Sequence, residues 1–431
     1  MEAIESQLRF NFGACNDKVL AKPLKLPTGK NTIMAAFDLL NLPDDFVPNA
    51  YAYFAELRAH SPVHQNSDGS YLLTRYDDMV AVYRNPKLWS SEKRGEFKPK
   101  FGDSSLYEHH TTSLVFRDAP DHTRIRKLFQ HAFTPKALTM LEPRIAALVK
   151  GYLDQLDDAG GMEIVSEFSF KLPVEVVCDM LGVPSEDREL IRDWALLILG
   201  ALEPKISKVQ FDAGCTAVDD FKAYLRDQIR LRRRNPATRR QGEILSDLMD
   251  AEADGEKLTE LELLHQCIFM LNAGHETSTN MISHGIHEFL RNPREITKLQ
   301  ADAGLADSAA EEVLRYQAPI QINNRRSTVD TTIGGVLLPA GTVVHLMLGA
   351  GNRDPAQFPE PDMFDIERRP NRHLSFGLGV HICAGNTLAR IEARIAFQEL
   401  FRRFPTLNLD APAKLAGRIR FREVEELRVS L

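Results

Sequence analysis

The segment FGLGVHICAG, residues 376–385, places Cys383 beside several glycines and directly before a predicted helix over residues 386–404. A thiolate that binds a metal needs a lowered pKa, backbone N–H groups that reach its sulfur, and protection from water. The positive end of the following helix lowers the pKa of the thiol, and glycines let the backbone approach the sulfur. A lone cysteine beside such a turn is usually a buried structural residue. The phenylalanine, three glycines and histidine at fixed offsets indicate a thiolate metal ligand instead.

The segment AGHET, residues 273–277, lies inside a second predicted helix, over residues 260–290. Glycine and threonine both disfavour the centre of a helix. The Thr277 hydroxyl can bond back to the carbonyl of Ala273, four residues earlier, and so bend the helix locally. The plain interpretation is a glycine used for packing and a threonine without a role. The alternative is a groove in which a small molecule such as dioxygen binds, beside Thr277 and Glu276.

Two further pairs of residues could hold charge on helices. His122 and Arg126, four residues apart, share one helix face and could together bind a carboxylate. Glu312 and Arg315, three residues apart, can pair with each other, although such a pair on a surface contributes only about 0–1 kcal/mol. Pairs of both kinds are also common on solvated helix faces, where they have no further role.

Together these segments resemble the cytochrome P450 family, whose cysteine loop has the pattern F-G-x-G-x-H-x-C-x-G and whose central helix carries A-G-x-[DE]-T. The resemblance runs from about Ala50 to the C-terminus, and it implies a haem b cofactor with Cys383 as the axial iron ligand. The residues that it places around the haem are His122, Arg126, Arg325, His381, Phe376, Gly377, Ala273 and Gly385. The adjacent Arg326 leaves the choice of Arg325 open by one position. The resemblance also implies a buried scaffold network of Glu312, Arg315 and Arg368.

The family implies a haem-thiolate monooxygenase that inserts one oxygen atom from O2 into a small to medium hydrophobic organic substrate, aromatic molecules included. Thr277 and Glu276 are then the catalytic residues, which deliver protons. The chain contains neither a G-x-G-x-x-G segment after a strand nor a four-cysteine cluster. Electrons are therefore expected from a separate [2Fe–2S] ferredoxin and an NAD(P)H-dependent reductase, with a flavodoxin as the other choice.

Three other functions can be weighed against this one. A peroxide-driven enzyme of the same fold would usually lack the pair Glu276 and Thr277. A non-catalytic haem protein that senses or carries gas needs neither that pair nor a large apolar pocket, and it is the alternative function. An interaction module that had lost its haem would be expected to lose Cys383 as well.

Helix periodicity predicts part of the substrate pocket. Counting back from Thr277 in fours gives Ala273 and Phe269, which share the face that looks onto the haem. Phe269 there would favour small or flat substrates, and Ile320 and Gln321 are expected to line the pocket too. The loop over residues 90–113 is expected to form the roof, with four basic residues, Lys93, Arg94, Lys98 and Lys100. These could hold a carboxylate or phenol, although solvated lysines are the commoner case.

Basic residues also cluster in the segments expected to surround the cysteine loop, among them Arg124 and Arg372. A surface patch of this sign would steer an acidic ferredoxin toward the loop. The association rate should then depend on salt, even though the formal net charge of the whole chain is -7.

The elements that must position these residues are mostly helices. Amphipathic or helical patterns cover residues 50–60, 138–156, 211–234, 260–290 and 386–404, and short strands are expected near residue 63 and over 71–74, 321–325 and 332–348. No linker separates the parts. We therefore expect a mostly α (α+β) single domain over residues 46–431, preceded by an N-terminal extension over residues 1–45.

Composition limits the cellular setting. The net charge argues against a protein that coats nucleic acid. The five cysteines are scattered and include no C-x-x-C pair, which fits a reducing compartment. No stretch approaches the roughly 18 apolar residues of a membrane-spanning helix, and the first residues lack the apolar run of a signal peptide. We expect a cytoplasmic monomer that binds neither membrane nor nucleic acid.

Overall fold

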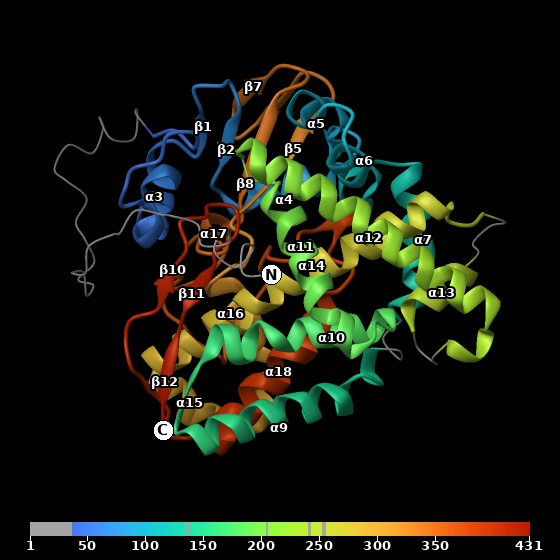
Figure 1. The fold of residues 1–431 in the computed structure, drawn as a ribbon. Coiled ribbons are helices and arrows are strands. Elements are labelled where there is room, and N and C mark those ends of the chain that lie inside the picture. Colours follow the sequence, from blue (N-terminus) through green and yellow to red (C-terminus); the bar gives the residue numbers. More distant parts are fainter. Residues whose placement is uncertain (1–36, 135–137, 204–205, 240–242, 252–255) are drawn as a thin grey trace.

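The computed structural model describes residues 37–134, 138–203, 206–239, 243–251 and 256–431. Helices make up most of this part of the chain; one group of strands lies at one end of it, and another lies near the C-terminus (Figure 1). The helices are α3 (Phe46–His60), α4 (Tyr76–Arg84), α5 (Arg94–Phe101), α6 (Ser105–Thr112), α7 (Asp121–Ala132), α9 (Glu142–Ala159), α10 (Lys171–Leu181), α11 (Arg188–Gly200), α12 (Lys208–Arg234), α13 (Ile244–Asp250), α14 (Glu260–Arg291), α15 (Pro293–Ala301), α16 (Ala306–Tyr316), α17 (Leu348–Gly351) and α18 (Asn386–Arg403). The mostly helical single-domain fold expected from the sequence is confirmed.

Helix α14 runs through the centre of the molecule (Figure 1). It has 32 residues and begins at a capping box, in which the Thr259 hydroxyl accepts from the Glu262 N–H and the Glu262 carboxylate accepts from the Thr259 N–H. Helices α10, α12, α16 and α18 pack against it. Most of its side chains are buried, polar ones included, as expected of a helix inside a large domain.

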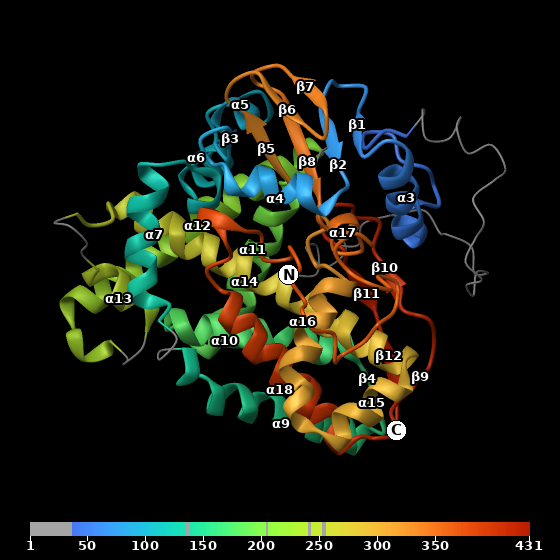
Figure 2. The ribbon, with the colours of Figure 1, turned by 180° about the vertical axis from the view of Figure 1, so that it is seen from behind.

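The described strands form four small sheets. The largest has the order β1-β2-β8-β5-β3 and contains β1 (Val63–Gln65), β2 (Tyr71–Leu73), β8 (Val343–Met347), β5 (Ile322–Ser327) and β3 (Trp89–Ser90), with only β2 and β8 parallel. The others are the hairpin of β6 (Thr331–Ile333) and β7 (Val336–Leu338), the pair β10 (Lys414–Leu415) and β11 (Val424–Glu426), and a three-stranded sheet of β4 (Gly161–Glu163), β12 (Arg428–Ser430) and β9 (Asn408–Leu409). A second hydrophobic core fills the space between the largest sheet, α3 and α4, apart from the main helical core (Figure 2).

Local patterns predicted the long helices better than the segment expected to be a roof loop. Helices α3, α12, α14 and α18 begin and end within a few residues of their expected limits. Residues 90–113, expected as a loop, contain helices α5 and α6, so this expectation was wrong. Pro99 lies inside α5, where proline is disfavoured, and it makes the segment look irregular in sequence. Strand β4 was missed because it pairs with β12 at the far end of the chain, which no local pattern reveals.

A buried ion network joins α16 to the segment that precedes the cysteine loop. Arg315 donates to both carboxylate oxygens of Glu312, at 2.7 and 2.8 Å, and both side chains are fully buried. Arg368 also donates to the Glu312 carboxylate, at 3.2 Å. Arg315 further donates to the carbonyls of Pro361 and Met363. These contacts fix the path of the chain toward Cys383, which is the scaffold role expected from the sequence.

Most of the expected N-terminal extension, residues 1–36, lies outside the described residues. The rest packs on the domain, because the Phe37 ring is buried against Phe46, Tyr53 and His64. None of the described helices combines the length and apolar character needed to cross a bilayer.

Glu392 is a buried carboxyl group between α18 and α14, with no described ion-pair partner. Burial raises the pKa of Glu392 to about 8, and the Ser278 hydroxyl opposes this only in part. The folded protein therefore keeps a proton that the unfolded chain loses above about pH 4.3.

Because only the folded state holds this proton, Glu392 should lower the free energy of unfolding as the pH rises from about 4.3 toward about 8, by up to about 1.4 kcal/mol per pH unit. We expect Glu392→Gln to remove this slope. Denaturant unfolding between about pH 6 and pH 8 measures it, with Glu399→Gln on the same helix as the control that follows the wild type. Parallel stability profiles for Glu392→Gln and the wild type would contradict the assignment.

Candidate functional site

Cys383 lies between the short turn η6 (Gly379–His381) and helix α18. Its N–H donates to the carbonyl of Phe376 at 2.9 Å, which closes the loop, and the Asn386 amide donates to its carbonyl at 2.6 Å. Burial raises the pKa of the Cys383 thiol, whereas the N–H of Gly385 and the charges of Arg126 and Arg390 lower it. The surroundings of Cys383 thus supply one N–H donor from the loop and two cations from α7 and α18. A bound metal ion would add further positive charge that favours the thiolate.

The loop glycines do different things. Gly377 and Gly379 have φ values of +67° and +75°, which favour glycine. A Cβ at Gly379 would also lie only 2.6 Å from the carbonyl oxygen of Tyr83, so no larger residue fits there. Gly385 has φ of -87°, a value that other residues also adopt. Its contribution is the N–H that reaches the sulfur of Cys383.

Four basic side chains meet beside this loop. His122 and His381 are buried with ring centroids 3.9 Å apart, and Arg126 and Arg325 lie near them. Burial, together with the neighbouring positive charges, lowers the pKa of His122 to about 4 and that of His381 to about 2. Among the described residues the nearest carboxylate is that of Asp118, at 4.0 Å from the His381 ring. The group therefore has donors to spare for an anion with several oxygens.

The structure separates the two neighbouring arginines of β5. Arg325 is only 6% exposed, and its guanidinium donates to Asn323 Oδ1 and lies over the Tyr83 ring. The Arg326 guanidinium donates to the carbonyl of Gly341 at 2.9 Å, nearer the surface. Arg325 is thus the one that joins the basic cluster.

The centre of α14 carries an open stripe. Ala273 is exposed and Phe269 and Thr277 are partly exposed, although most other residues of this part of the helix are buried. The three are spaced by four residues and so share one face. The Thr277 hydroxyl donates to the carbonyl of Ala273 at 2.9 Å, as expected. Gly274 has the plain packing role, because a Cβ there would lie 2.9 Å from a methyl of Val177 on α10.

Glu276 is buried and pairs with Arg418 from the C-terminal part of the chain. Arg418 also binds Glu203 at 2.9 Å and Glu423 at 3.1 Å, so three carboxylates share one guanidinium. Burial raises the pKa of Glu276 to about 7, and the attraction of Arg418 limits the shift. Glu276 can therefore release and regain a proton near neutral pH. The sequence analysis did not find Arg418.

Comparison with known proteins gives matches to one family and to relatives that cover most of this chain. A family model described as cytochrome P450 matches residues 205–413. The biotin biosynthesis cytochrome P450 of Bacillus subtilis is 36% identical over 390 residues, which cover 90% of this chain and 97% of the relative. The chain belongs to the cytochrome P450 family. The vitamin D(3) 25-hydroxylase of Pseudonocardia autotrophica is also 36% identical, over 369 residues that cover 84% of this chain and 88% of the relative.

Solved structures agree with this P450 assignment. The crystal structure of P450BioI in complex with hexadec-9Z-enoic acid ligated acyl carrier protein superposes with a TM-score of 0.84 at 36% identity, covering 90% of this chain and 99% of that one. CalO2 superposes with a TM-score of 0.85 at 30% identity, covering 92% and 98%. As a P450, this chain is an oxygen-incorporating oxidoreductase with a haem b cofactor, which does not favour the alternative of a gas sensor or carrier.

The residues of this P450 fit that cofactor. Haem has an iron that can bind a thiolate, and it also carries two propionate carboxylates that need hydrogen-bond donors. The half-buried Cys383, whose sulfur accepts an N–H, suits the first need. His122, Arg126, Arg325 and His381, without a bound carboxylate among the described residues, suit the second.

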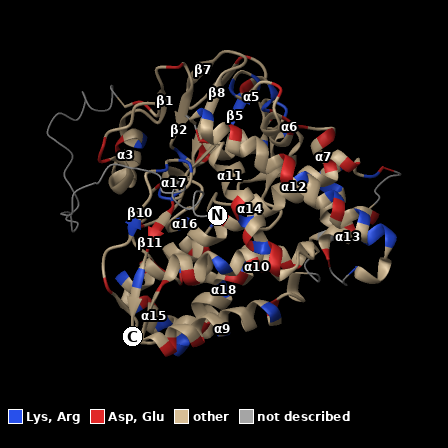
Figure 3. Cartoon of the chain, viewed as in Figure 1, with Lys and Arg blue, Asp and Glu red and all other residues tan. Residues whose placement is uncertain are grey.

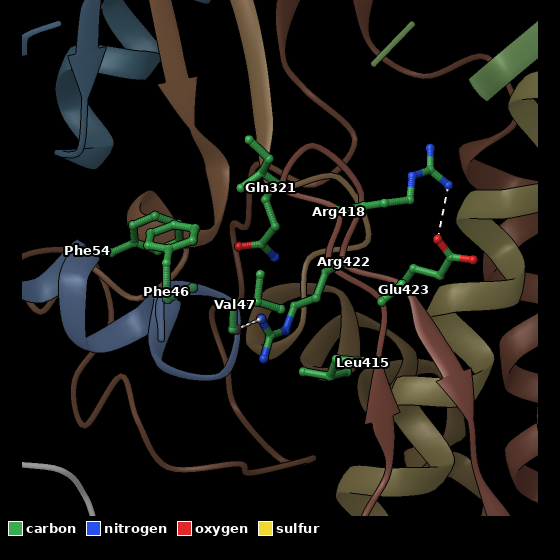
Figure 4. Close-up of a pocket in the computed structure, with 11 residues that line it drawn as sticks. Phe46, Val47, Phe54, Gln321, Leu415, Arg418, Arg422 and Glu423 are labelled. Carbon is green, nitrogen blue, oxygen red and sulfur yellow. Dashed lines mark hydrogen bonds and ion pairs between the residues drawn. The ribbon is translucent and has the colours of Figure 1, made fainter. Parts of the chain in front are cut away.

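Two residues expected in the substrate pocket of this P450 lie at the C-terminal turn. Ile320 forms a β-bridge with Phe421 and stays partly exposed. Gln321 is buried and turned toward α3, where its amide donates to the carbonyl of Ala318 at 2.6 Å and to the Tyr51 hydroxyl at 3.3 Å. There it lines a small pocket that Phe46 and Phe54 also line (Figure 4). The structure thus does not bring Gln321 to the stripe of Thr277.

Proposed function

We propose that this P450 holds haem b through Cys383 and inserts one oxygen atom from O2 into a small to medium hydrophobic substrate. The observation that carries the proposal is the half-buried Cys383, whose sulfur accepts the N–H of Gly385 beside Arg126. The catalytic domain is proposed to span residues 46–431. His122, Arg126, Arg325 and His381 would bind the haem propionates. Phe376, Gly377, Gly385 and Ala273 would contact the rest of the cofactor, and Phe269, Ala273 and Ile320 the substrate.

When bound, haem supplies the reductive activation of dioxygen. The protein's own part is to hold and move protons. The Thr277 hydroxyl, held against the Ala273 carbonyl, can turn its oxygen toward a partner on the open stripe and pass a proton on. The neighbouring residue Glu276 is the next group in the proton path, and its pKa of about 7 lets it supply that proton and regain it. Arg418 holds the Glu276 carboxylate and so tunes its proton affinity.

The partners proposed for this P450 are O2, an organic substrate, a separate [2Fe–2S] ferredoxin and its NAD(P)H-dependent reductase. Related proteins bear the names cytochrome P450 monooxygenase PikC and cyclomarin C epoxidase, which suit an oxygen-inserting reaction of this kind. A monomer in the cytoplasm, without membrane or nucleic acid, is the setting that we propose.

Thr277→Ala should divert electrons from product to peroxide, because the proton path is broken while haem and substrate still bind. We expect product formed per NADH consumed to fall at least tenfold, toward the roughly 10²–10⁴-fold that a positioned acid contributes. We expect coupling in the wild type to fall as the pH rises through about 7, where Glu276 gives up its proton. Glu276→Gln should remove this pH dependence of coupling.

The matched control is Thr279→Ala. Thr279 donates to the carbonyl of His275 at 3.0 Å, in the same way as Thr277 to Ala273, but it is buried away from the stripe. It should keep wild-type coupling. Equal coupling in Thr277→Ala and Thr279→Ala would remove Thr277 from the mechanism.

The face beside the cysteine loop suits a negatively charged electron donor. Arg369 and Arg372 are exposed there, with the exposed apolar side chains of Val380 and Ile382 in the loop itself. Arg124, expected in the same patch, is instead engaged by Glu262 and Glu256. On the face shown in Figure 3, α9 and α10 carry both basic and acidic residues.

Reduction of the haem by ferredoxin should slow steeply as salt rises from about 0.1 M to 1 M, because the screening length falls from about 10 Å to about 3 Å. Arg372→Glu should slow reduction at low salt and weaken the salt dependence. Arg230→Glu on α12 serves as the control, since Arg230 is 64% exposed on another part of the surface. Stopped-flow reduction rates test this, and a flat salt profile with Arg372→Glu at the wild-type rate would place the partner elsewhere.

A further inference from the structure

The turn between β10 and β11 carries arginines at 418, 420 and 422. Figure 4 shows Arg418 and Arg422 pointing to opposite sides of the turn. Arg418 binds its three carboxylates, and Arg422 donates to Gln317 Oε1 at 2.8 Å and to the carbonyl of Val47 at 3.3 Å. Both outer arginines therefore have partners within the protein.

Arg420, between them, is different. Its guanidinium makes no hydrogen bond or ion pair with any described residue. Burial lowers its pKa, and the only carboxylates that oppose this shift, Glu96 and Glu203, act from beyond ion-pair distance. Each already has a cation of its own, since Lys93 binds Glu96 at 2.7 Å and Arg418 binds Glu203 at 2.9 Å. The Arg420 side chain is partly exposed and has no partner among the described residues, so an external anion could reach it and would stabilise it.

The turn is fastened to the centre of α14 and to the start of β5. Arg418 pairs with Glu276, next to Thr277, and the N–H of Val424 donates to Asn280 Oδ1 at 3.2 Å. On the other side Phe421 bridges Ile320, and the carbonyl of Arg420 accepts from the N–H of Gln321 at 2.9 Å. The backbone of Arg420 is thus held between the centre of α14 on one side and Ile320 on the other.

The guanidinium of Arg420 also lies close to the roof. Its charge helps to lower the pKa values of Lys93, Lys100 and His345. The two lysines have partners already, Glu96 for Lys93 and the carbonyls of Ala201 and Glu203 for Lys100. Lys98, also expected as an anchor, pairs with Asp103 at the surface. The roof lysines are therefore not free to hold a substrate anion, and Arg420 is.

We propose that Arg420 anchors the carboxylate of a hydrophobic carboxylic acid, which is the substrate class of this enzyme. The inference rests on the proposed monooxygenase function. A planar guanidinium matches a carboxylate through two parallel N–H donors. One unpaired cation suits a singly charged acid better than a phosphate, and the apolar remainder of the acid would lie along Phe269 and Ala273. The Nδ1 atom of His345, buried without a described partner, offers a further polar contact nearby.

The test compares acids with their neutral amides. Straight-chain fatty acids of increasing length and 4-alkylbenzoates, each with the matching primary amide, are titrated by calorimetry into haem-loaded enzyme. We expect the best acid to bind the wild type roughly 10- to 100-fold more tightly than its amide, as for a charge-assisted hydrogen-bonded pair. Arg420→Gln should abolish this preference and leave amide affinity within about threefold, and Arg420→Lys should keep part of it.

Arg326→Gln is the matched control, because it removes a cation that also acts on Glu96 but is bonded to Gly341. It should keep the preference for acids. Arg420→Gln should also be at least as stable as the wild type in thermal unfolding, since no protein contact is lost. If no acid binds more tightly than its amide, or the preference survives in Arg420→Gln, the proposal is wrong. Acid binding without oxygenated product would overturn the monooxygenase function and leave the anchor standing.

Discussion

A negative sulfur inside a protein must be compensated, and this constraint governs the arrangement around Cys383. Burial raises the pKa of the thiol, while one N–H from Gly385 and two arginines, Arg126 and Arg390, lower it. An iron ion bound to the sulfur would add positive charge that favours the thiolate. The tight loop, in which Gly379 passes the carbonyl of Tyr83 without room for a Cβ, is the local backbone cost of holding the sulfur there.

Buried and partly buried arginines in this molecule fall into two kinds. Arg315, Arg368 and Arg418 are bound by carboxylates, and they hold segments of the fold together. Arg126 and Arg420 have no such partner among the described residues. Because these partly exposed arginines have no partner within the described protein, they mark places where an anion from outside the chain is expected. One such place suits haem propionates and the other suits a substrate.

Much of the site could be predicted from the sequence because its motifs are local. The loop around Cys383, the Thr277 bond to Ala273 and the Glu312–Arg315 pair each depend on residues close together in the chain. The sequence left the choice between Arg325 and Arg326 open, and the structure buries the former. What local patterns could not give was pairing across the chain, such as Arg418 with Glu276 or β4 with β12.

Three arginines alternate in RIRFRE, and a period of two would place them on one face of an extended chain. In the structure Arg418 and Arg422 instead point to opposite sides of a turn, so this pattern did not predict their directions. Gln321 shows that position in the sequence does not give the direction of a side chain. Its neighbour Ile320 bridges Phe421 on the Arg420 turn, but the amide turns toward Tyr51, and no sequence pattern distinguishes these directions.

The measurement that tests the account most directly is the absorbance spectrum of the reduced carbon-monoxide complex for the wild type, Cys383→Ser and Cys215→Ser. Cys215 is a half-buried cysteine on α12, apart from the cysteine loop, and it serves as the matched control. The account predicts the long-wavelength band of a haem thiolate in the wild type and in Cys215→Ser, and its loss in Cys383→Ser while circular dichroism shows the helices retained. The same band in Cys383→Ser, or its absence from the wild type loaded with haem, would contradict the assignment of Cys383.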